Sequence, residues 1–307
     1  MNKIPLIVVA GATASGKTSL AINIAKEFNG EVVSCDSMQV YKYMDIGTAK
    51  PTVSEMDGVK HHLIDIITPD VNFSVAEYSK LAHEAILDIT KRGKLPILTG
   101  GTGLYINSVV NDIEFEESEE NPEIRKELSE FADKNGAGAL HKILREIDPA
   151  SADKIHENNI KRVIRAIEVF RTTGERLSDH NEKSKEIESR YHPVMMEILW
   201  DRAELYDRIN RRVDIMMDLG LEEETKKLYN MGYTKDLTSM QGIGYKEMFE
   251  YFDGVWSIDE AIDKIKQYSR NYAKRQNTWF KKDKRIIRLT PSSNVEKQAY
   301  DVIKYGL

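Results

Sequence analysis

The chain has 307 residues, is 41% hydrophobic and 31% charged, and carries a formal net charge of −6, which is typical of a soluble globular protein of one or two domains. Its apolar runs are far shorter than the roughly 18 residues that span a bilayer, and no basic-then-apolar leader opens it, so we expect a cytoplasmic protein without a membrane partner. The acidic balance excludes a uniformly basic nucleic-acid coat, and Cys35, the only cysteine, excludes an intramolecular disulfide.

The first predicted strand, residues 4–10, runs into a glycine-rich loop. Residues 11–18 match the pattern G-x-x-x-x-G-K-[ST], and a helical run follows at 19–28, which is the context that this phosphate-binding motif requires. Backbone N–H groups of such a loop hold phosphate oxygens, Lys17 reaches the outer phosphates, and the Thr18 hydroxyl can hold Mg²⁺. The predicted site for a di- or triphosphate consists of Gly11, Ala12, Thr13, Ala14, Ser15, Gly16, Lys17 and Thr18.

Strands and helices alternate through the N-terminal part of the chain. Further apolar runs that read as strands lie at residues 31–35, 62–66 and 95–99. Ser74 and Glu77 form a capping box that starts a long helix. This alternation predicts an α/β fold with a parallel sheet core like that of P-loop nucleoside-triphosphate hydrolases. Ligands of such sheets bind at the C-terminal ends of the strands, where Gly11, Asp36 and Gly100 fall.

The rhythm changes after the fourth predicted strand. The acidic stretch 114–120 is typical of a solvated connector, and a strand pattern returns only at 193–200. Predicted helices fill the interval at residues 122–135, 137–147 and 159–173. We therefore expect a catalytic core of residues 1–112 and 193–307 and a helical insertion domain of residues 113–192.

The C-terminal part is predicted to be helical, and its last long helix carries many cations. Ser257 and Glu260 form a second capping box. The stretch from Lys266 to Arg288 is rich in Lys and Arg and contains only one carboxylate, Asp283. We therefore expect nucleic-acid contact here, with an ordinary solvated helix face as the alternative. Predicted helices lie at 203–219, 221–230, 245–252 and 257–282. The apolar residues expected to face the core are Ile258, Ile262, Ile265, Tyr272 and Trp279.

Two reaction classes fit the phosphate loop. An ATP-dependent kinase is the default for such a loop on a parallel sheet. If the bond that breaks joins carbon to oxygen, however, the whole diphosphate leaves as the product. Both chemistries need Mg²⁺, Lys17 and N–H donors on the same oxygens, so the residues around the acceptor must decide between them.

Seven motifs supply that information: DSMQVY at 36–41, MDIGTAKP at 44–51, HHLID at 61–65, FSVAEY at 73–78, GGTGLY at 100–105, QGIGYK at 241–246 and YAKRQ at 272–276. Each is weak alone, but the ordered set resembles the tRNA dimethylallyltransferase family. The resemblance implies transfer of a dimethylallyl group from dimethylallyl diphosphate to the exocyclic N6 amine of the adenine 3′ of the anticodon, in tRNAs that read codons beginning with U. It also implies Mg²⁺ as cofactor and the tRNA anticodon stem-loop as partner, and we expect a monomer.

The predicted catalytic residues follow from this chemistry and from the resemblance. An adenine amine is a weak nucleophile because its lone pair is delocalised, so a positioned base should help. The resemblance assigns that role to Asp36; the alternative is that Asp36 caps the next turn. It assigns Arg212 to the departing diphosphate, although the residues alone do not separate it from Arg208 or Arg211. It makes Thr102 a contact to the target nucleotide, and an N-cap role for the following helix is compatible with that.

The resemblance further implies tRNA contacts at Asp36, Ser37, Met38, Gln39, Thr102, Arg125, Lys161, Arg162, Arg165, Gln241, Gly242, Lys246, Lys274 and Arg275. Arg162 and Arg165 are three apart on a helix, so a plain exposed face is the alternative there. His61 and His62 point to opposite faces of a strand, which favours structural roles over a metal site.

Two other enzyme classes remain as alternatives. One is an adenylate isopentenyltransferase, which performs similar chemistry on a free nucleotide, and the other is an ATP-dependent small-molecule kinase, which predicts ATP turnover without RNA. A free nucleotide needs neither a helical insertion nor a basic helix, so these features favour tRNA. The base must then leave the anticodon stack to reach Asp36.

Overall fold

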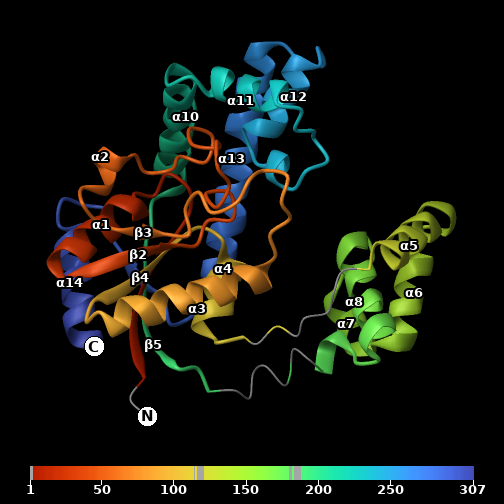
Figure 1. Cartoon of the computed structure of the whole chain (residues 1–307), viewed down its shortest axis with the longest axis horizontal. Helices are drawn as coiled ribbons and strands as arrows, with labels where there is room; N and C mark the ends of the chain where they lie inside the picture. The colour runs from red at the N-terminus through yellow and green to blue at the C-terminus, as the bar shows by residue number, and fades with distance from the viewer. Residues whose placement is uncertain (1–2, 114, 116–120, 180–181, 183–187) are drawn as a thin grey trace. The chain divides into compact units, whose positions relative to one another are not determined.

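The computed structural model describes residues 3–113, 115, 121–179, 182 and 188–307. The chain divides into two units, one made of Met1–Val110 and Ser189–Leu307 and the other of Asn111–Glu188 (Figure 1). The boundaries expected from the sequence fall after residues 112 and 192, close to these divisions. Apart from Phe115, the acidic stretch 114–120 lies outside the described residues.

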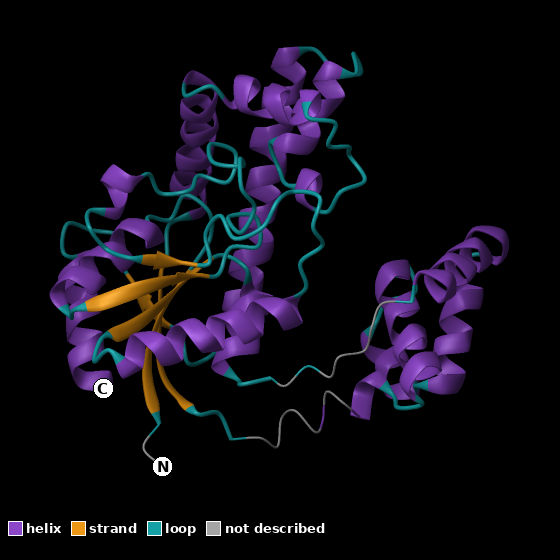
Figure 2. Ribbon diagram, in the orientation of Figure 1, coloured by secondary structure: helices purple, strands orange, loops and turns teal. Residues whose placement is uncertain are grey.

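The larger unit is built on a sheet of six parallel strands in the order β3-β2-β4-β1-β5-β6. They are β1 (Ile4–Ala10), β2 (Gly30–Ser34), β3 (His61–His62), β4 (Leu95–Gly100), β5 (Tyr191–Ile198) and β6 (Ile287–Leu289). Because β1 lies between β4 and β5, the phosphate loop that follows it opens in the middle of the C-terminal edge of the sheet (Figure 2). The predicted α/β fold with a parallel sheet is confirmed.

Two strands depart from the prediction. Only the start of the 62–66 run is strand, because Leu63 and Asp65 take positive φ angles of 63° and 56°, which interrupt an extended chain. The sequence does not predict β6 or the helix after it, α14 (Val295–Gly306). With three residues, two of them exposed, β6 is too short for an alternating pattern to reveal it.

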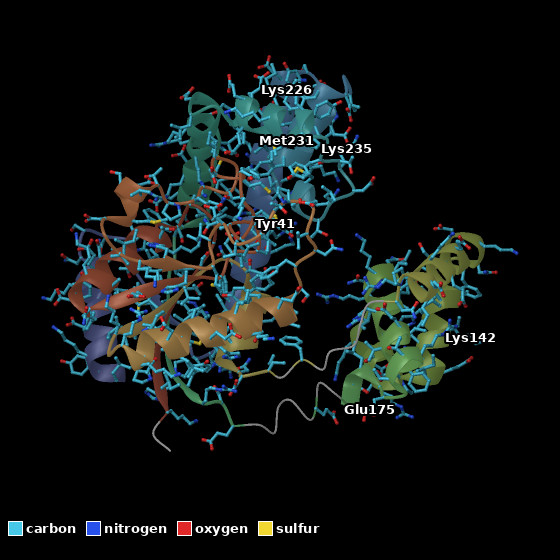
Figure 3. The ribbon with its side chains drawn as sticks, in the orientation of Figure 1. Tyr41, Lys142, Glu175, Lys226, Met231 and Lys235 are labelled. Atoms are coloured by element: carbon cyan, nitrogen blue, oxygen red, sulfur yellow. The ribbon has the colours of Figure 1, made fainter. Side chains whose placement is uncertain are left out.

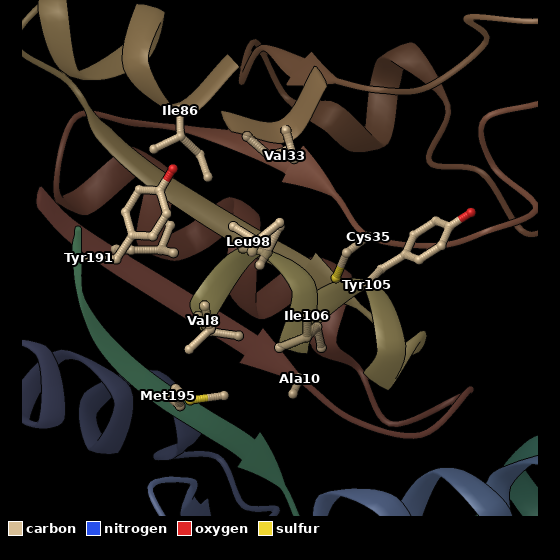
Figure 4. Close-up of a cluster of buried hydrophobic side chains, with 14 of the residues drawn as sticks. Val8, Ala10, Val33, Cys35, Ile86, Leu98, Tyr105, Ile106, Tyr191 and Met195 are labelled. Atoms are coloured by element: carbon tan, nitrogen blue, oxygen red, sulfur yellow. The ribbon is translucent and has the colours of Figure 1, made fainter. Parts of the chain in front are cut away.

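Helices cover both faces of the sheet. The face toward α3 (Val75–Lys91) and α4 (Gly103–Val110) receives Leu6 and Val8 of β1, whereas Ile7 and Val9 lie on the face toward α1 (Lys17–Glu27) and α14. Burial of both faces explains why β1 is an unbroken apolar run. Cys35 lies inside the first of these cores (Figure 4), so the lone thiol is a buried packing residue.

The C-terminal helices are α10 (Arg202–Asp218), α11 (Leu221–Asn230), the short η1 (Ser239–Gln241), α12 (Tyr245–Phe252) and α13 (Ile258–Phe280), and a short helix α2 (Val53–Met56) lies between β2 and β3. Both predicted capping boxes, at Ser74 and Ser257, are present. The expectation that Trp279 faces the core is wrong, because its side chain is 39% exposed. Its indole instead covers the start of α4, where a Cβ on Gly103 would lie 2.3 Å from the ring.

The smaller unit contains α5 (Pro122–Asn135), α6 (Ala137–Ile147), α7 (Pro149–Lys154) and α8 (Ile160–Thr173). It has its own hydrophobic core, which includes Leu128, Leu140, Leu144 and Ile167. The sequence predicts α5, α6 and α8 but not α7, which is a helix of six residues. Across both units, no helix in the described residues is long and apolar enough to cross a bilayer.

Candidate active site

The phosphate loop, residues 11–18, joins β1 to α1 and has the backbone of an anion nest. Gly11, Ala14 and Gly16 take positive φ angles of 148°, 61° and 91°, and such interruptions turn successive N–H groups toward one point. Gly16 directly precedes α1, so the loop also lies at a helix N-terminus, where partial positive charge favours anions. This local geometry is the one that a phosphate requires.

Three charged side chains act on one another at this loop: Lys17, Arg212 on α10, and Asp36 just after β2. Burial lowers the pKa of Lys17 to about 8; the charge of Arg212 also lowers it, and Asp36 opposes the shift. Burial likewise lowers the pKa of Arg212, again opposed by Asp36. The Lys17 ammonium donates to the Ala12 carbonyl oxygen at 3.3 Å. Both side chains are half-buried, and the two cations repel each other, so an anion bound between them gains from both charges.

The structure separates the three arginines that the sequence leaves open. Arg211 is 75% exposed and pairs with Asp207 one turn away on α10. Arg208 donates from Nε to the Ala14 carbonyl oxygen at 2.8 Å, and its guanidinium lies 4.2 Å from the ring centroid of Trp200. Of the three, Arg212 is the one whose charge acts on Lys17 and Asp36.

The side chain of Asp36 also fixes its own turn. Its Oδ1 accepts a hydrogen bond from the backbone N–H of Met38 at 3.0 Å, which is the capping role that the sequence left as an alternative. One oxygen bonded in this way does not prevent a carboxylate from accepting a proton on the other. Asp36 is therefore held in a fixed orientation at the end of β2.

The Thr102 hydroxyl connects the loops that follow β2 and β4. It accepts from the Ser37 backbone N–H at 3.1 Å and donates to the Ser37 Oγ at 3.4 Å. The loops approach closely because Gly100 has no side chain: a Cβ there would lie 2.5 Å from the Cys35 carbonyl oxygen. The Thr102 hydroxyl is thus directed at the Asp36–Ser37 turn rather than at the helix N-terminus that follows it.

The side chains of Gln39 and Lys50 hold the loop of residues 44–50. Gln39 Nε2 donates to the carbonyl oxygens of Thr48 and Ala49 at 3.2 Å each, and its Oε1 accepts from Ser34 at 3.0 Å. Lys50 Nζ, almost fully buried, donates to the Tyr41 carbonyl oxygen at 2.6 Å and pairs with Asp45 and Asp65. The amide of Gln39, which is predicted to contact tRNA, is hydrogen-bonded to this loop.

Glu224 on α11 holds the same loop from the other side, and the sequence does not predict it. Its carboxylate accepts from the backbone N–H groups of Asp45, Ile46 and Gly47 at 2.9, 2.8 and 3.1 Å, and from the Tyr245 hydroxyl at 2.7 Å. Acidic residues are common in the first turn of a helix, where they usually face solvent. The sequence pattern therefore does not distinguish Glu224 from its neighbours Glu222 and Glu223.

Two further site residues that the sequence does not single out lie in one turn of α13. Gln276 is hydrogen-bonded both to the phosphate loop and to the loop after β4, through Thr13 and Gly101. Burial and the charge of Asp36 raise the pKa of Tyr272 to about 12, while hydrogen bonds with Thr102 and Gln276 oppose the shift. Both residues belong to the YAKRQ motif, which is the signal that could have pointed to them.

A pH dependence follows from Lys17. Below about pH 8 its ammonium is charged and attracts a diphosphate, whereas above its lowered pKa of about 8 the amine is neutral and the attraction is lost. We expect the dissociation constant for a diphosphate ligand to rise by up to about tenfold per pH unit above 8. Titration calorimetry between about pH 7 and 10 measures this. The Lys17→Arg variant stays charged and should not show the rise; a parallel rise in both proteins would contradict the prediction.

Comparison with known proteins identifies the family of the chain. A family model described as IPP transferase matches residues 39–283. The chain belongs to the IPP transferase family. A protein of Acetivibrio thermocellus named tRNA dimethylallyltransferase is 53% identical over 277 residues, which cover 90% of this chain and 88% of the relative. One of the same name from Clostridioides difficile is 48% identical over 307 residues, covering 99% and 98% of the two chains.

Solved structures of the IPP transferase family also resemble this chain. The full-length tRNA isopentenylpyrophosphate transferase of Bacillus halodurans is 44% identical, with a TM-score of 0.73 and coverage of 100% of this chain and 98% of the other. A eukaryotic dimethylallyltransferase described as acting on tRNA has a TM-score of 0.83 at 29% identity, covering 97% of this chain and 78% of the other. The fold is therefore shared along nearly the whole chain.

Part of the basic stretch predicted in this IPP transferase, residues 266–288, is paired within the protein. Lys266 pairs with Asp214 of α10 at 2.5 Å, Arg288 pairs with Glu197 of β5 at 3.0 Å, and Arg270 donates to Asn210 at 2.5 Å. The stretch therefore carries fewer unpaired cations than its own sequence suggests, because the residues that pair with them lie on α10 and β5. Lys274 and Arg275 are exposed.

Among the predicted tRNA contacts of the insertion, Arg125 and Arg165 share one buried carboxylate. They bind Glu168, whose side chain is 0% exposed, at 2.8 Å each. Burial alone would raise the pKa of Glu168, but hydrogen bonds from both arginines lower it. Removing either arginine would leave a buried charge poorly compensated, so both have a structural role. Lys161 and Arg162 are exposed on α8.

In the QGIGYK motif of the IPP transferase fold, Tyr245 bonds Glu224, one glycine contacts Met38, and two side chains are exposed. A Cβ on Gly242 would lie 3.2 Å from the Met38 sulfur, so these two predicted residues lie together. Gln241 is exposed and donates to the Lys235 carbonyl oxygen, and Lys246 is exposed on α12. The motif therefore packs one of its glycines against the turn that carries Asp36.

Proposed function

We propose that the protein transfers a dimethylallyl group from dimethylallyl diphosphate to the N6 amine of the adenine 3′ of the anticodon, in tRNAs that read codons beginning with U. The observation that carries the proposal is that the charges of Lys17, Arg212 and Asp36 act on one another at the phosphate loop. Cations for a leaving diphosphate and a carboxylate for an amine proton occupy one site. A kinase can also use a carboxylate as a base, so it is the names of the relatives, tRNA dimethylallyltransferase, that favour prenyl transfer to tRNA over phosphoryl transfer.

On the acceptor side, Asp36 is the proposed general base. A bond forms between N6 and the dimethylallyl carbon as the bond from that carbon to the diphosphate oxygen breaks. The N6 proton passes to the Asp36 carboxylate, which the Met38 N–H holds in orientation. Thr102 and Ser37, bonded to each other beside Asp36, are the proposed contacts to a base that has flipped out of the anticodon stack.

On the donor side, negative charge grows on the oxygen that leaves. Lys17, Arg212 and the N–H groups of the phosphate loop are the proposed donors that stabilise it. The residues present fit a Mg²⁺ ion, because Thr18 presents a hydroxyl oxygen at the start of α1 and Mg²⁺ completes its shell with phosphate oxygens and water. Bound there, Mg²⁺ would neutralise charge on the diphosphate.

The deciding experiment incubates tRNA with the protein, Mg²⁺ and dimethylallyl diphosphate and follows the nucleosides by mass spectrometry. We expect a dimethylallyl group on the adenosine 3′ of the anticodon and one diphosphate released for each. Modification of free AMP in preference to tRNA would favour an adenylate isopentenyltransferase, and ADP formed from ATP in step with product would favour a kinase. We propose that the enzyme works as a monomer on tRNA in the cytoplasm.

A binding prediction tests the exposed cations of α13. Phosphate contacts release counterions, so tRNA affinity should fall steeply with salt, and each lost contact should flatten the logarithmic slope by roughly 0.7 to 0.9 units. Replacing Lys274 and Arg275 together with Ala should therefore reduce both the affinity and the slope. Fluorescence titrations at several salt concentrations measure both quantities.

The matched control for this prediction replaces Lys91 and Lys304, which are exposed in the last turns of α3 and α14. Lys226 on α11 (Figure 3) is less suitable, because its ammonium lies over the rings of Tyr229 and Phe252, at 4.9 and 4.4 Å from their centroids. Equal behaviour of the two double variants would mean that α13 presents only a solvated face.

A further inference from the structure

One buried amide joins the two loops that the proposed reaction must bring into line. Gln276 of α13 is 5% exposed. Its Oε1 accepts from the Thr13 backbone N–H of the phosphate loop at 2.9 Å, and its Nε2 donates to the Gly101 carbonyl oxygen, in the loop before Thr102, at 3.0 Å. Both halves of the amide are therefore used, one on each loop.

The neighbourhood of Gln276 is shaped for these two bonds. A Cβ on Gly101 would lie 2.1 Å from the Gln276 Nε2, so the approach requires glycine at that position. Ala273, three residues earlier on the same helix, is fully buried and packs in one cluster with Ala12 of the phosphate loop. A single turn of α13 thus touches both loops.

We propose that Gln276 is a positioning residue that fixes the diphosphate loop relative to the acceptor loop. This inference rests on the proposed function. Prenyl transfer needs the amine, the carbon and the leaving oxygen in line, and misplacement by about 1 Å can cost a factor of 10² in rate. Gln276 touches neither substrate in this role; it acts by setting the distance between the groups that hold them.

The amide of Gln276 meets both requirements with two separate atoms. Thr13 offers a donor and Gly101 an acceptor, so the bridging side chain must accept on one arm and donate on the other. A carboxylate can serve only Thr13, and an ammonium only Gly101. The bond also directs the Thr13 N–H at Gln276, which leaves the later N–H groups of the loop to face the diphosphate.

If the two loops are no longer held in a fixed relative position, water should compete with the adenine amine for the dimethylallyl carbon. The bond from the dimethylallyl carbon to the diphosphate oxygen would still break, but the new bond would form to a water oxygen, whose proton goes to solvent. The products are dimethylallyl alcohol and diphosphate. The number of diphosphates released per modified adenosine therefore reports on positioning, and a loss of folded protein alone would leave that number unchanged.

The test compares Gln276→Met, which keeps the volume and loses both bonds, with the matched control Gln298→Met. Gln298 of α14 also bonds a backbone N–H and a carbonyl oxygen with its amide, both of Thr290, at 3.0 and 3.1 Å. For Gln276→Met we expect kcat to fall by roughly 10- to 100-fold, both KM values to change little, and more than one diphosphate to be released per modified adenosine. Gln298→Met should keep the wild-type ratio of one.

Gln276→Glu keeps the acceptor for Thr13 and loses the donor to Gly101. Its number of diphosphates released per modified adenosine should therefore lie between those of the wild type and Gln276→Met. If Gln276→Met does not fold, Gln276→Glu takes its place in the test. A ratio of one in the Gln276 variants, with activity that follows only the folded fraction, would overturn the inference. Failure of the proposed function is distinct, because then the wild-type protein itself would not modify tRNA.

Discussion

Replacing Asp36 with Asn should lower the rate constant of prenyl transfer by roughly 10²- to 10⁴-fold while leaving the affinity for tRNA nearly unchanged. Asn cannot take the amine proton, but its Oδ1 can still accept the Met38 N–H bond that Asp36 makes at 3.0 Å. The variant therefore removes the base and preserves the turn. Single-turnover measurements at saturating substrates give the rate constant, and a separate titration gives the tRNA affinity.

Asp36→Ala provides the matched comparison, because it removes the base and the turn-capping oxygen together. We expect it to be at least as slow as Asp36→Asn and also to bind tRNA less well, since Ser37 and Thr102 are positioned by the same turn. Full turnover by Asp36→Asn would remove Asp36 from the proton transfer and leave it only the capping role.

The second large effect is expected at Arg212. Arg212→Met should lower kcat by roughly 10²- to 10³-fold, the usual cost of removing one donor that stabilises developing negative charge. Arg211→Met, one position away, is its control: the Arg211 side chain is exposed and paired with Asp207, so we expect little change. Steady-state kinetics with varied dimethylallyl diphosphate compare the two variants.

Arg208→Met should lose more activity than Arg211→Met and less than Arg212→Met, and the cause of its loss should differ. Arg208 holds the Ala14 carbonyl oxygen and stacks on Trp200, so its loss should loosen the phosphate loop and raise the KM for dimethylallyl diphosphate more than it lowers kcat. A loss of kcat in Arg211→Met as large as in Arg212→Met would show that the assignment within α10 is wrong.

The sequence by itself determines those parts of the protein that depend on local pattern. The phosphate loop, the strand before it and the helices α5, α6, α11 and α12 lie where the sequence predicts them. The capping boxes at Ser74 and Ser257 form as expected. Each of these features is decided by hydrogen bonds and side-chain spacing within a few residues, which a single sequence displays directly.

Tertiary structure decides which side chains serve the site. Gln276 bonds a residue 263 positions away and Glu224 one 179 positions away, and no local pattern relates such pairs. Lys266 is paired with Asp214 of α10, so it is not one of the free cations that the sequence predicts on α13. Successive residues of a helix point about 100° apart, so Arg211 and Arg212 differ only in which side of α10 meets the loops, and that side is fixed by how the helix packs on the core.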